Sequence, residues 1–218
     1  VTNNELGDPK HYGRIEYVYY LMARDAGIDM SECRLIEENG RAHFMTKRFD
    51  RVNGNEKLHM QTLCGMAHYD YKMIHAYSYE QVFQVMRRLR LSYSDAEQMF
   101  RRMVFNVVAR NQDDHTKNIS FLMDRQGKWS LSPAYDVSWA YNPKGIWTSN
   151  HQMSINNKSD EITRDDLLSV ARNVNIKHAD QIIDQVIESV SHWPDLAKEY
   201  GIPDDIEKAI NSTLLLDM

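Results

Sequence analysis

Cysteine is scarce in this sequence, which has two, Cys33 and Cys64, among 218 residues. They form neither a Cys-X-X-Cys pair nor a spacing typical of metal ligands. A scaffold that depends on disulfides or structural zinc is therefore excluded. We expect both thiols to be reduced and buried, as in proteins of the cytoplasm.

Long apolar runs and an excess of positive charge are also missing. No stretch approaches the roughly 18–20 apolar residues that a membrane-spanning helix needs. The formal net charge is -5 and the pI is near 6.0, which argues against a general nucleic-acid surface. The 42% of hydrophobic residues is ordinary for a globular protein, enough for one large domain or two small lobes.

Hydrophobic periodicity and turn signals predict the first elements of the chain. Apolar residues recur at helical spacing over residues 13–26, and Gly27 is placed to end that helix. Two strands, 33–36 and 42–49, flank an Asn-Gly turn signal and so predict a hairpin. The polar segment 50–59 is predicted to be a loop.

The remainder is predicted to be mostly helical. Ser94 and Glu97 predict a capping box at the start of the second of these helices. A second hairpin is expected from strands 119–123 and 129–131. The helices are expected over residues 80–91, 95–110, 164–173, 180–191 and 204–215.

The most informative segment joins the second of these helices to the second hairpin. It reads Asn-Gln-Asp-Asp-His-Thr-Lys-Asn from Asn111 to Asn118. Asp113 and Asn118 are five residues apart, and Asp136 lies eighteen residues beyond Asn118. Protein kinases space their catalytic-loop aspartate, magnesium-binding asparagine and second magnesium-binding aspartate in this way. A polar cluster is often only a solvated turn, but here an apolar helix and an apolar strand flank it.

The residue types suit phosphoryl transfer. That reaction needs a base near the attacking hydroxyl, Mg²⁺ on the phosphates and cations that face the transferring group. Mg²⁺ prefers oxygen ligands and takes only one or two from protein, a role that suits Asn118 and Asp136. Asp113 suits the base, and Lys117 is placed to neutralise developing charge. His115 could brace the loop or contact a phosphate.

Two further polar residues of the loop are given a structural interpretation. We expect the side chains of Asn111 and Asp114 to hydrogen-bond the local backbone and so to shape the loop.

Four motifs, in the same order along the chain, resemble those of HipA-type toxin serine/threonine kinases. Residues 113–118, Asp-Asp-His-Thr-Lys-Asn, resemble the family's catalytic loop Asp-Gly-His-Ala-Lys-Asn. Residues 132–137, Ser-Pro-Ala-Tyr-Asp-Val, resemble its Thr-Pro-Phe-Tyr-Asp-Ile stretch, and residues 48–51 match its Arg-Phe-Asp-Arg hinge. Residues 151–156 resemble a further segment near the family's active site. The resemblance covers nearly the whole chain.

The resemblance implies catalytic roles. Asp113 would be the general base, Asn118 and Asp136 the magnesium ligands, and His115 and Lys117 phosphate contacts. The implied cofactors are ATP and Mg²⁺. The implied substrate is a protein phosphorylated on serine or threonine. A toxin–antitoxin setting with a DNA-binding HipB-like partner is implied as well.

The resemblance also implies a nucleotide site at the hinge. Backbone groups around Lys47, Arg48 and Phe49 would receive the adenine, with Asp50 near the ribose. We also expect Tyr135 to contact the nucleotide.

The expected fold class is α+β and protein-kinase-like, of the HipA type, with a small β-hairpin remnant before a mostly α-helical lobe. We expect residues 1–60 to form the remnant of the N-terminal lobe with the hinge. Residues 61–218 are expected to form the helical C-terminal lobe with the catalytic loop.

The sequence departs from the family pattern at several places. Lys47 stands where the family usually carries Glu, and Asp114 replaces a Gly beside the base. The phosphate-covering loop and the ATP-binding lysine are expected upstream of the first helix, and Lys10 is too close to that helix to serve. Because Val1 rather than Met comes first, we expect a fragment or a processed chain, with weak or absent ATP binding by these 218 residues alone.

Two other functions are compatible with the same residues. The first is a catalytically inactive kinase-like scaffold that binds a HipB-like antitoxin. The second is a metal-dependent hydrolase that uses Asp113, Asp114, His115 and Asp136, although Asn118 and Lys117 would then have no role.

Residues outside the motifs are interpreted as structural. Glu16 stands where the kinase helix glutamate would lie, without a lysine partner. The tyrosines of the first helix are expected to pack the lobe: Tyr17, Tyr19 and Tyr20. Four histidines lack the spacing of metal ligands: His43, His59, His68 and His75. Six arginines are expected on solvated helix faces rather than on a partner or DNA surface: Arg87, Arg88, Arg90, Arg101, Arg102 and Arg110.

Overall fold

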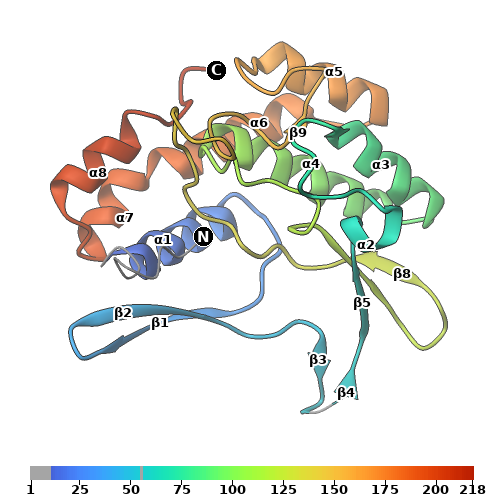
Figure 1. The fold of residues 1–218 in the computed structure, drawn as a ribbon, viewed down its shortest axis with the longest axis horizontal. Helices are drawn as coiled ribbons and strands as arrows, with labels where there is room; N and C mark the ends of the chain where they lie inside the picture. Colours follow the sequence, from blue (N-terminus) through green and yellow to red (C-terminus); the bar gives the residue numbers. More distant parts are fainter. Residues whose placement is uncertain (1–10, 55) are drawn as a thin grey trace.

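Helix α1 (Tyr12–Asp25) lies between a long hairpin on one side and a group of helices on the other (Figure 1). The computed structural model describes residues 11–54 and 56–218. Lys10, considered above, lies outside the described residues. Helix α1 contacts both strands of the hairpin and also contacts α6 and α7. It therefore joins the β-rich part of the molecule to the helical part.

The prediction of the first helix is confirmed. Its buried face includes Val18, Tyr19 and Met22, which recur at helical spacing and are fully shielded from solvent. Gly27, with φ +77°, follows the helix in the left-handed conformation that glycine adopts without strain. The helix is thus fixed by burial along its length and by glycine at its end.

The first hairpin is also confirmed. Strands β1 (Cys33–Glu38) and β2 (Arg41–Thr46) pair antiparallel. Asn39 and Gly40 both have positive φ, as a two-residue type I′ turn requires. The second strand ends at Thr46 rather than at residue 49, because the chain turns there into the hinge.

The prediction of a loop over residues 50–59 is wrong in part. Strands β3 (Arg51–Val52) and β4 (Glu56–Lys57) form a short antiparallel hairpin. Strand β5 (His59–Thr62) pairs with β7 in a three-stranded sheet of order β5-β7-β8. These strands are too short and polar to give a periodic signal, and β5 depends on a partner some sixty residues away.

The second predicted hairpin forms the rest of that sheet. Strands β7 (Ser120–Met123) and β8 (Trp129–Leu131) pair antiparallel. A separate two-stranded parallel sheet joins β6 (Tyr77–Ser78) to β9 (Met153–Ser154). Both sheets lie beside the loop that follows α4.

The predicted helical character of the remainder is confirmed. Two helices, α2 and α7, were not predicted from the sequence. Trp193 at the start of α7 is fully buried, and its ring packs edge-on against Tyr19 of α1. The helices are α2 (Leu63–Ala67), α3 (Tyr79–Arg88), α4 (Tyr93–Val108), α5 (Arg164–Val174), α6 (Ala179–Ser191), α7 (Trp193–Glu199) and α8 (Asp204–Asn211).

Helix α4 begins two residues earlier than predicted. Its capping box pairs Ser92 with Asp95, not Ser94 with Glu97. The second carboxylate oxygen of Asp95 also accepts a hydrogen bond from the Leu131 amide, at 3.0 Å. This contact with β8 favours the Ser92 cap over the Ser94 cap. Local sequence patterns could not indicate it, because Leu131 is thirty-six residues away.

Two of the six arginines do not lie on a solvated face, which corrects the prediction. Arg101 and Arg102 of α4 are buried. Arg101 donates to the Ala26 carbonyl at 2.7 Å, and Arg102 donates to the Ser132 carbonyl at 2.6 Å. A guanidinium can be buried in this way because carbonyl oxygens at the ends of other elements accept its hydrogens. Arg87, Arg88 and Arg90 are exposed as predicted, whereas Arg110 is half-buried and donates to the Thr213 carbonyl.

Both cysteines are free, as predicted, but only Cys33 is buried and Cys64 is half-buried. Among the described residues, no helix combines the length and apolar character that a bilayer span requires.

Candidate active site

The loop after α4 is held in place by backbone hydrogen bonds on both sides. The amide of Gln112 donates to the Ala140 carbonyl at 3.1 Å, and the amide of Cys64 donates to the Thr116 carbonyl at 3.0 Å. The loop starts after Arg110, whose φ of +55° turns the chain out of the helix. The polar segment is therefore a supported loop rather than a free turn.

A pocket lies where this loop meets α3, α4 and the segment around Asp136. Its cavity volume is small, about 30 Å³ for the centre of a water-sized sphere. Four of the predicted site residues line it: His115, Asn118, Tyr135 and Asp136. The others, Asp113, Lys117 and the hinge residues Lys47, Arg48, Phe49 and Asp50, are not part of this lining.

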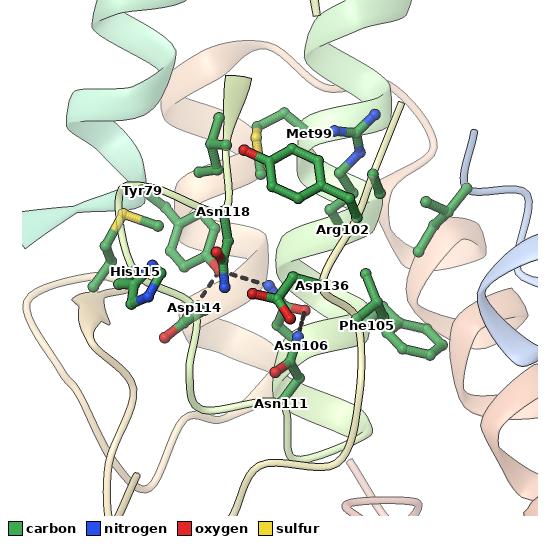
Figure 2. Close-up of a pocket in the computed structure, with 16 residues that line it drawn as sticks. Tyr79, Met99, Arg102, Phe105, Asn106, Asn111, Asp114, His115, Asn118 and Asp136 are labelled. Carbon is green, nitrogen blue, oxygen red and sulfur yellow. Dashed lines mark hydrogen bonds between the residues drawn. The ribbon is translucent and has the colours of Figure 1, made fainter. Parts of the chain in front are cut away.

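Asn118 and Asp136 come together although they are eighteen residues apart. Their side chains point toward the same part of the pocket (Figure 2). The side-chain amide of Asn118 donates to the Asp113 carbonyl at 2.9 Å, which fixes its orientation. Asp136 has a φ of +57°, an uncommon conformation that Asp tolerates better than most residues. The β7–β8 hairpin between them supplies the geometry.

Asp113 lies at the edge of this arrangement and remains open to solvent. Its side chain is 47% exposed. Partial burial raises the pKa of its carboxyl, and the negative charges of Asp136 and Asp114 raise it further, while His115 opposes them. An accessible carboxylate with a raised pKa suits proton transfer better than an ordinary aspartate.

His115 and Lys117 flank Tyr71, a residue that the sequence did not single out. The ring of His115 packs edge-on against that of Tyr71, and the Lys117 ammonium lies 3.6 Å from the centre of the same ring. The Nδ1 atom of His115 is buried and has no hydrogen-bond partner among the described residues. The other ring nitrogen, Nε2, lies 3.9 Å from the Asp113 carboxylate, and the side chain as a whole is 20% exposed.

The hinge meets the loop through aromatic side chains. The ring of Phe49 packs 5.6 Å from that of Tyr135. The Tyr135 hydroxyl donates to the Lys117 carbonyl at 2.5 Å and accepts from the Ser120 hydroxyl. Tyr135 therefore connects Phe49 to the end of the loop that follows α4.

The polar hinge residues are paired with one another. Both carboxylate oxygens of Asp50 accept hydrogen bonds from Arg48, at 2.9 and 2.7 Å, and Arg51 also binds that carboxylate. The backbone amide of Lys47 donates to the Glu32 carbonyl at 2.9 Å. An adenine contact at Lys47 would thus have to use its carbonyl oxygen.

Asp114 does not hydrogen-bond the local backbone, which corrects the prediction. Its side chain is only 1% exposed. It accepts from the hydroxyl of Tyr79 at 2.8 Å, from Nδ1 of His151 at 2.9 Å and from the amide of Gln152 at 2.7 Å. All three donors are more than thirty residues away in sequence, so no local pattern could have indicated them.

Two residues of the pocket were missed. Tyr79 of α3 and Asn106 of α4 line it, and the Asn106 amide donates to the Tyr79 hydroxyl at 3.0 Å (Figure 2). Asn106 did give a signal, because it is a lone polar residue within the apolar stretch from Met103 to Val108. The side chain of Asn111 was expected to shape the loop by bonding the local backbone. It donates instead to the Asn106 side chain of α4, at 3.0 Å.

The pKa of Glu16, on α1, is also affected by this site. Its burial, followed by the negative charge of Asp136, raises its pKa from 4.5 to about 7. The position expected for a kinase helix glutamate therefore does lie near the proposed metal ligand.

The donor set fits a magnesium ion. Asn118 and Asp136 offer one amide and one carboxylate, both hard oxygen donors, to the same pocket. Over residues 11–54 and 56–218, no group of three or more His, Cys, Asp or Glu side chains is placed to hold a metal ion. Magnesium does not need such a group, since water and phosphate supply most of its ligands.

Comparison with known proteins gives two curated relatives with kinase names. "Putative kinase Y4mE" of Sinorhizobium fredii is 26% identical over 125 residues, which cover 53% of this chain and 30% of that protein. A protein of Haemophilus influenzae named "Putative kinase" is 25% identical over 134 residues, covering 56% of this chain and 39% of the relative. The chain thus matches about a third of the length of these relatives.

Two solved structures share the fold. HipA of Shewanella oneidensis, solved with HipB and its operator DNA, superposes with a TM-score of 0.76 at 17% identity, over 94% of this chain and 54% of HipA. The proinflammatory kinase CtkA of Helicobacter pylori superposes with a TM-score of 0.54 at 14% identity, over 93% of this chain and 84% of CtkA. The predicted α+β, kinase-like fold is therefore confirmed.

The family model for the HipA-like C-terminal domain matches residues 3–193, most of the chain. This chain accordingly belongs to the HipA-like C-terminal domain family.

Proposed function

We propose that this domain takes part in the transfer of the γ-phosphate of ATP to a serine or threonine hydroxyl of a protein, with Mg²⁺. One observation carries the proposal: Asn118 and Asp136 face the same pocket, and Asn118 is hydrogen-bonded to the backbone of Asp113. A kinase site needs a base and two oxygen ligands in such an arrangement. The kinase names of two relatives support the same reaction.

In this proposal, Asp113 orients the acceptor hydroxyl and takes up its proton. Its exposure leaves room for a protein substrate, while its raised pKa favours proton uptake in the transition state. His115, whose side chain is 20% exposed, would contact a phosphate oxygen through Nε2, the ring nitrogen that lies 3.9 Å from the Asp113 carboxylate. Lys117 would leave the Tyr71 ring to meet the phosphates, since a cation–π contact is weak enough to be exchanged.

The adenine would bind at the hinge, and the phosphates would extend from there to the metal ligands. The hinge backbone around Arg48 and Phe49 would receive the adenine, next to the Tyr135 ring. The magnesium ion would be held by Asn118 and Asp136. When bound, it would neutralise phosphate charge as it develops in the transition state.

The partner and setting are part of the same proposal. HipA was solved with HipB and operator DNA, and we propose a HipB-like antitoxin as the partner of this chain, in the cytoplasm. We also propose the division into an N-terminal remnant, residues 1–60, and a helical lobe, residues 61–218.

Phosphate transfer from labelled ATP, by the full-length protein with Mg²⁺, tests the function. Casein and the protein itself serve as acceptors, with phosphoamino-acid analysis of the product. We expect Asp113→Asn to lower the rate at least 100-fold, since the base is lost. Asp165→Asn is the matched control, because Asp165 is an exposed aspartate on α5.

Other outcomes separate the alternatives. Equal transfer by Asp113→Asn would show that the base is assigned wrongly. A wild-type protein that binds a HipB-like antitoxin tightly but transfers no phosphate is the inactive scaffold. Metal-dependent hydrolysis without ATP would indicate the hydrolase, although Asp114 is already bound to Tyr79, His151 and Gln152.

A further inference from the structure

We infer that Asp114 is a positioning residue, whose buried carboxylate fixes the catalytic loop against α3 and the 151–156 segment. The inference rests on the proposed function for its effect on rate, but the geometry stands independently. Asp114 cannot be a catalytic residue, because a side chain that is 1% exposed does not reach a substrate.

Three donors meet the carboxylate from two distant segments. One oxygen accepts from the Tyr79 hydroxyl and from Nδ1 of His151, and the other accepts from the backbone amide of Gln152. A buried carboxylate is strongly unfavourable unless donors surround it. The position of the Asp114 carboxylate therefore depends on the positions of α3 and of the 151–156 segment. In turn, the carboxylate holds those two parts in place.

The donors lie at one structural junction. Tyr79 directly follows strand β6, and Gln152 directly precedes strand β9. These two strands pair in parallel, with Tyr77 opposite Met153 and Ser78 opposite Ser154. Asp114 thus binds both sides of a pairing that joins α3 to the chain beyond Asp136. One carboxylate holds the loop of the base to the segment that continues from the metal ligand.

The network returns to the start of the loop through α4. Tyr79 accepts from Asn106, and Asn106 accepts from Asn111, at 3.0 Å in each case (Figure 2). Burial, and after it the charge of Asp114, raise the pKa of Tyr79 well above its usual range, so Tyr79 remains a donor. Asp113 therefore lies between two ends of one hydrogen-bonded network, at Asn111 and at Asp114.

The charge of Asp114 matters as well as its shape. A carboxylate accepts at both oxygens, whereas an amide of the same shape has one acceptor and one donor group. In Asp114→Asn, the amide NH₂ must face either the Gln152 N–H or the side-chain donors. The variant therefore either loses the Gln152 hydrogen bond or forces His151 into its other tautomer, although the volume of the side chain is kept.

Steady-state kinetics and amide hydrogen exchange of the full-length protein test this inference. For Asp114→Asn we expect kcat to fall about 10–100-fold, the loss that a small misplacement of a reacting group causes, with the KM for ATP unchanged. The amides of Gln112 and Asn118, which bond Ala140 and His115, should exchange at least ten times faster. Tyr79→Phe should show the same pattern more weakly, and it serves if Asp114→Asn does not fold.

Asp166→Asn is the matched control. Asp166 is a similarly buried aspartate that accepts from Lys158, Asn156 and Thr163. It does not line the pocket, and it reaches the 151–156 segment only at the Asn156 side chain, beyond the β6–β9 pairing that Asp114 binds. It should lower the melting temperature without changing kcat or the exchange of the two loop amides. The inference is overturned if Asp114→Asn keeps the wild-type kcat and exchange rates. It is equally overturned if Asp166→Asn lowers kcat as much for the same loss of stability.

The two proposals fail in different ways. If the wild-type protein transfers no phosphate, the proposed function fails, and the exchange rates alone then decide the inference. Faster exchange at Gln112 and Asn118 in Asp114→Asn but not in Asp166→Asn supports the positioning role, whereas equal exchange overturns it.

Discussion

Asp136 lies near other carboxyl groups, and its negative charge affects the pKa of Glu16 on α1. Burial and the charge of Asp136 together raise the pKa of Glu16 to about 7. The charge of Asp136 also raises the pKa of Asp113. Carboxylates brought together in this way are typical of sites that bind a cation or move a proton. Because these carboxylates repel one another when they are ionised, the free energy of unfolding should depend on pH.

Glu16→Gln should stabilise the metal-free protein at high pH. A glutamate ionises with a pKa near 4.3 in the unfolded chain but near 7 in the folded protein, so Glu16 loses its favourable contribution as the pH rises through that window. The gain in free energy of unfolding should be on the order of 2–3 kcal/mol at pH 8. It should be close to zero at pH 4. Urea denaturation at both pH values measures it.

The Asp136→Asn background provides the control, because it removes one of the two causes of the raised pKa. There the gain from Glu16→Gln should be smaller. A gain that is the same at pH 4 and pH 8 would contradict the assignment to ionisation.

Among the elements, α1 and the β1–β2 hairpin approach each other closely, and Gly13 permits it. A Cβ on Gly13 would collide with the carbonyl oxygen of Ala42 and would lie 3.1 Å from the amide nitrogen of Phe44. Both atoms belong to the backbone of β2, which cannot turn aside as a side chain can. The distance between helix and hairpin is therefore set by the absence of a side chain.

Gly13→Ala should destabilise the protein by about 1–3 kcal/mol, the usual cost of overpacking, although alanine is the better helix former. Gly65→Ala is the control, because the nearest neighbours of a Cβ there are side-chain atoms, of Gln61 at 3.4 Å and of Thr62 at 3.6 Å. That variant should be neutral or slightly stabilising. Chemical denaturation of both variants gives the comparison, and equal stabilities would refute the close-contact argument.

Across the whole molecule, the C-terminal residues support both sides of the catalytic loop. The Thr213 carbonyl accepts from Arg110 at 2.9 Å, and its hydroxyl accepts from the indole of Trp139 at 3.1 Å. The amide of Leu215 donates to the Val108 carbonyl at 2.9 Å. Residues just before Asn111 and just after Asp136 are thus tied to the same short segment.

Thr213→Val should cost about 1–3 kcal/mol of unfolding free energy, because the partly buried Trp139 N–H loses its acceptor while side-chain volume is kept. Thr213→Ser retains the hydroxyl and should cost less. Urea denaturation measures both. A larger loss in Thr213→Ser than in Thr213→Val would show that the methyl group, not the hydrogen bond, holds the segment.

Local patterns predicted much of the fold correctly. The helical periodicity of α1 and the Asn39-Gly40 turn depend only on neighbouring residues, so the sequence was sufficient. The helix of residues 204–215 was predicted too long, because Leu215 leaves the helix to bond Val108. Similarly, β5 becomes a strand only by pairing with β7. Each error lies where a distant partner competes with the local preference.

The candidate site was likewise predictable only where it depends on local sequence. The spacing of Asp113, Asn118 and Asp136 is a property of the sequence, because a hairpin of fixed length returns Asp136 to the loop. Of the predicted residues, Asn118 and Asp136 do meet at one pocket. The roles of all the predicted site residues stay predictions: Lys47, Arg48, Phe49, Asp50, Asp113, His115, Lys117, Asn118, Tyr135 and Asp136.

The sequence by itself determined the family motifs, the order of helices and hairpins, and the chemical types gathered around Asp113. Only the tertiary structure decided what surrounds them. Asp114 was expected to shape its own loop, and instead its carboxylate joins α3 to the 151–156 segment. The physical reason is burial: a charged group removed from water must find donors wherever the fold places them, and their positions are not encoded in the neighbouring residues.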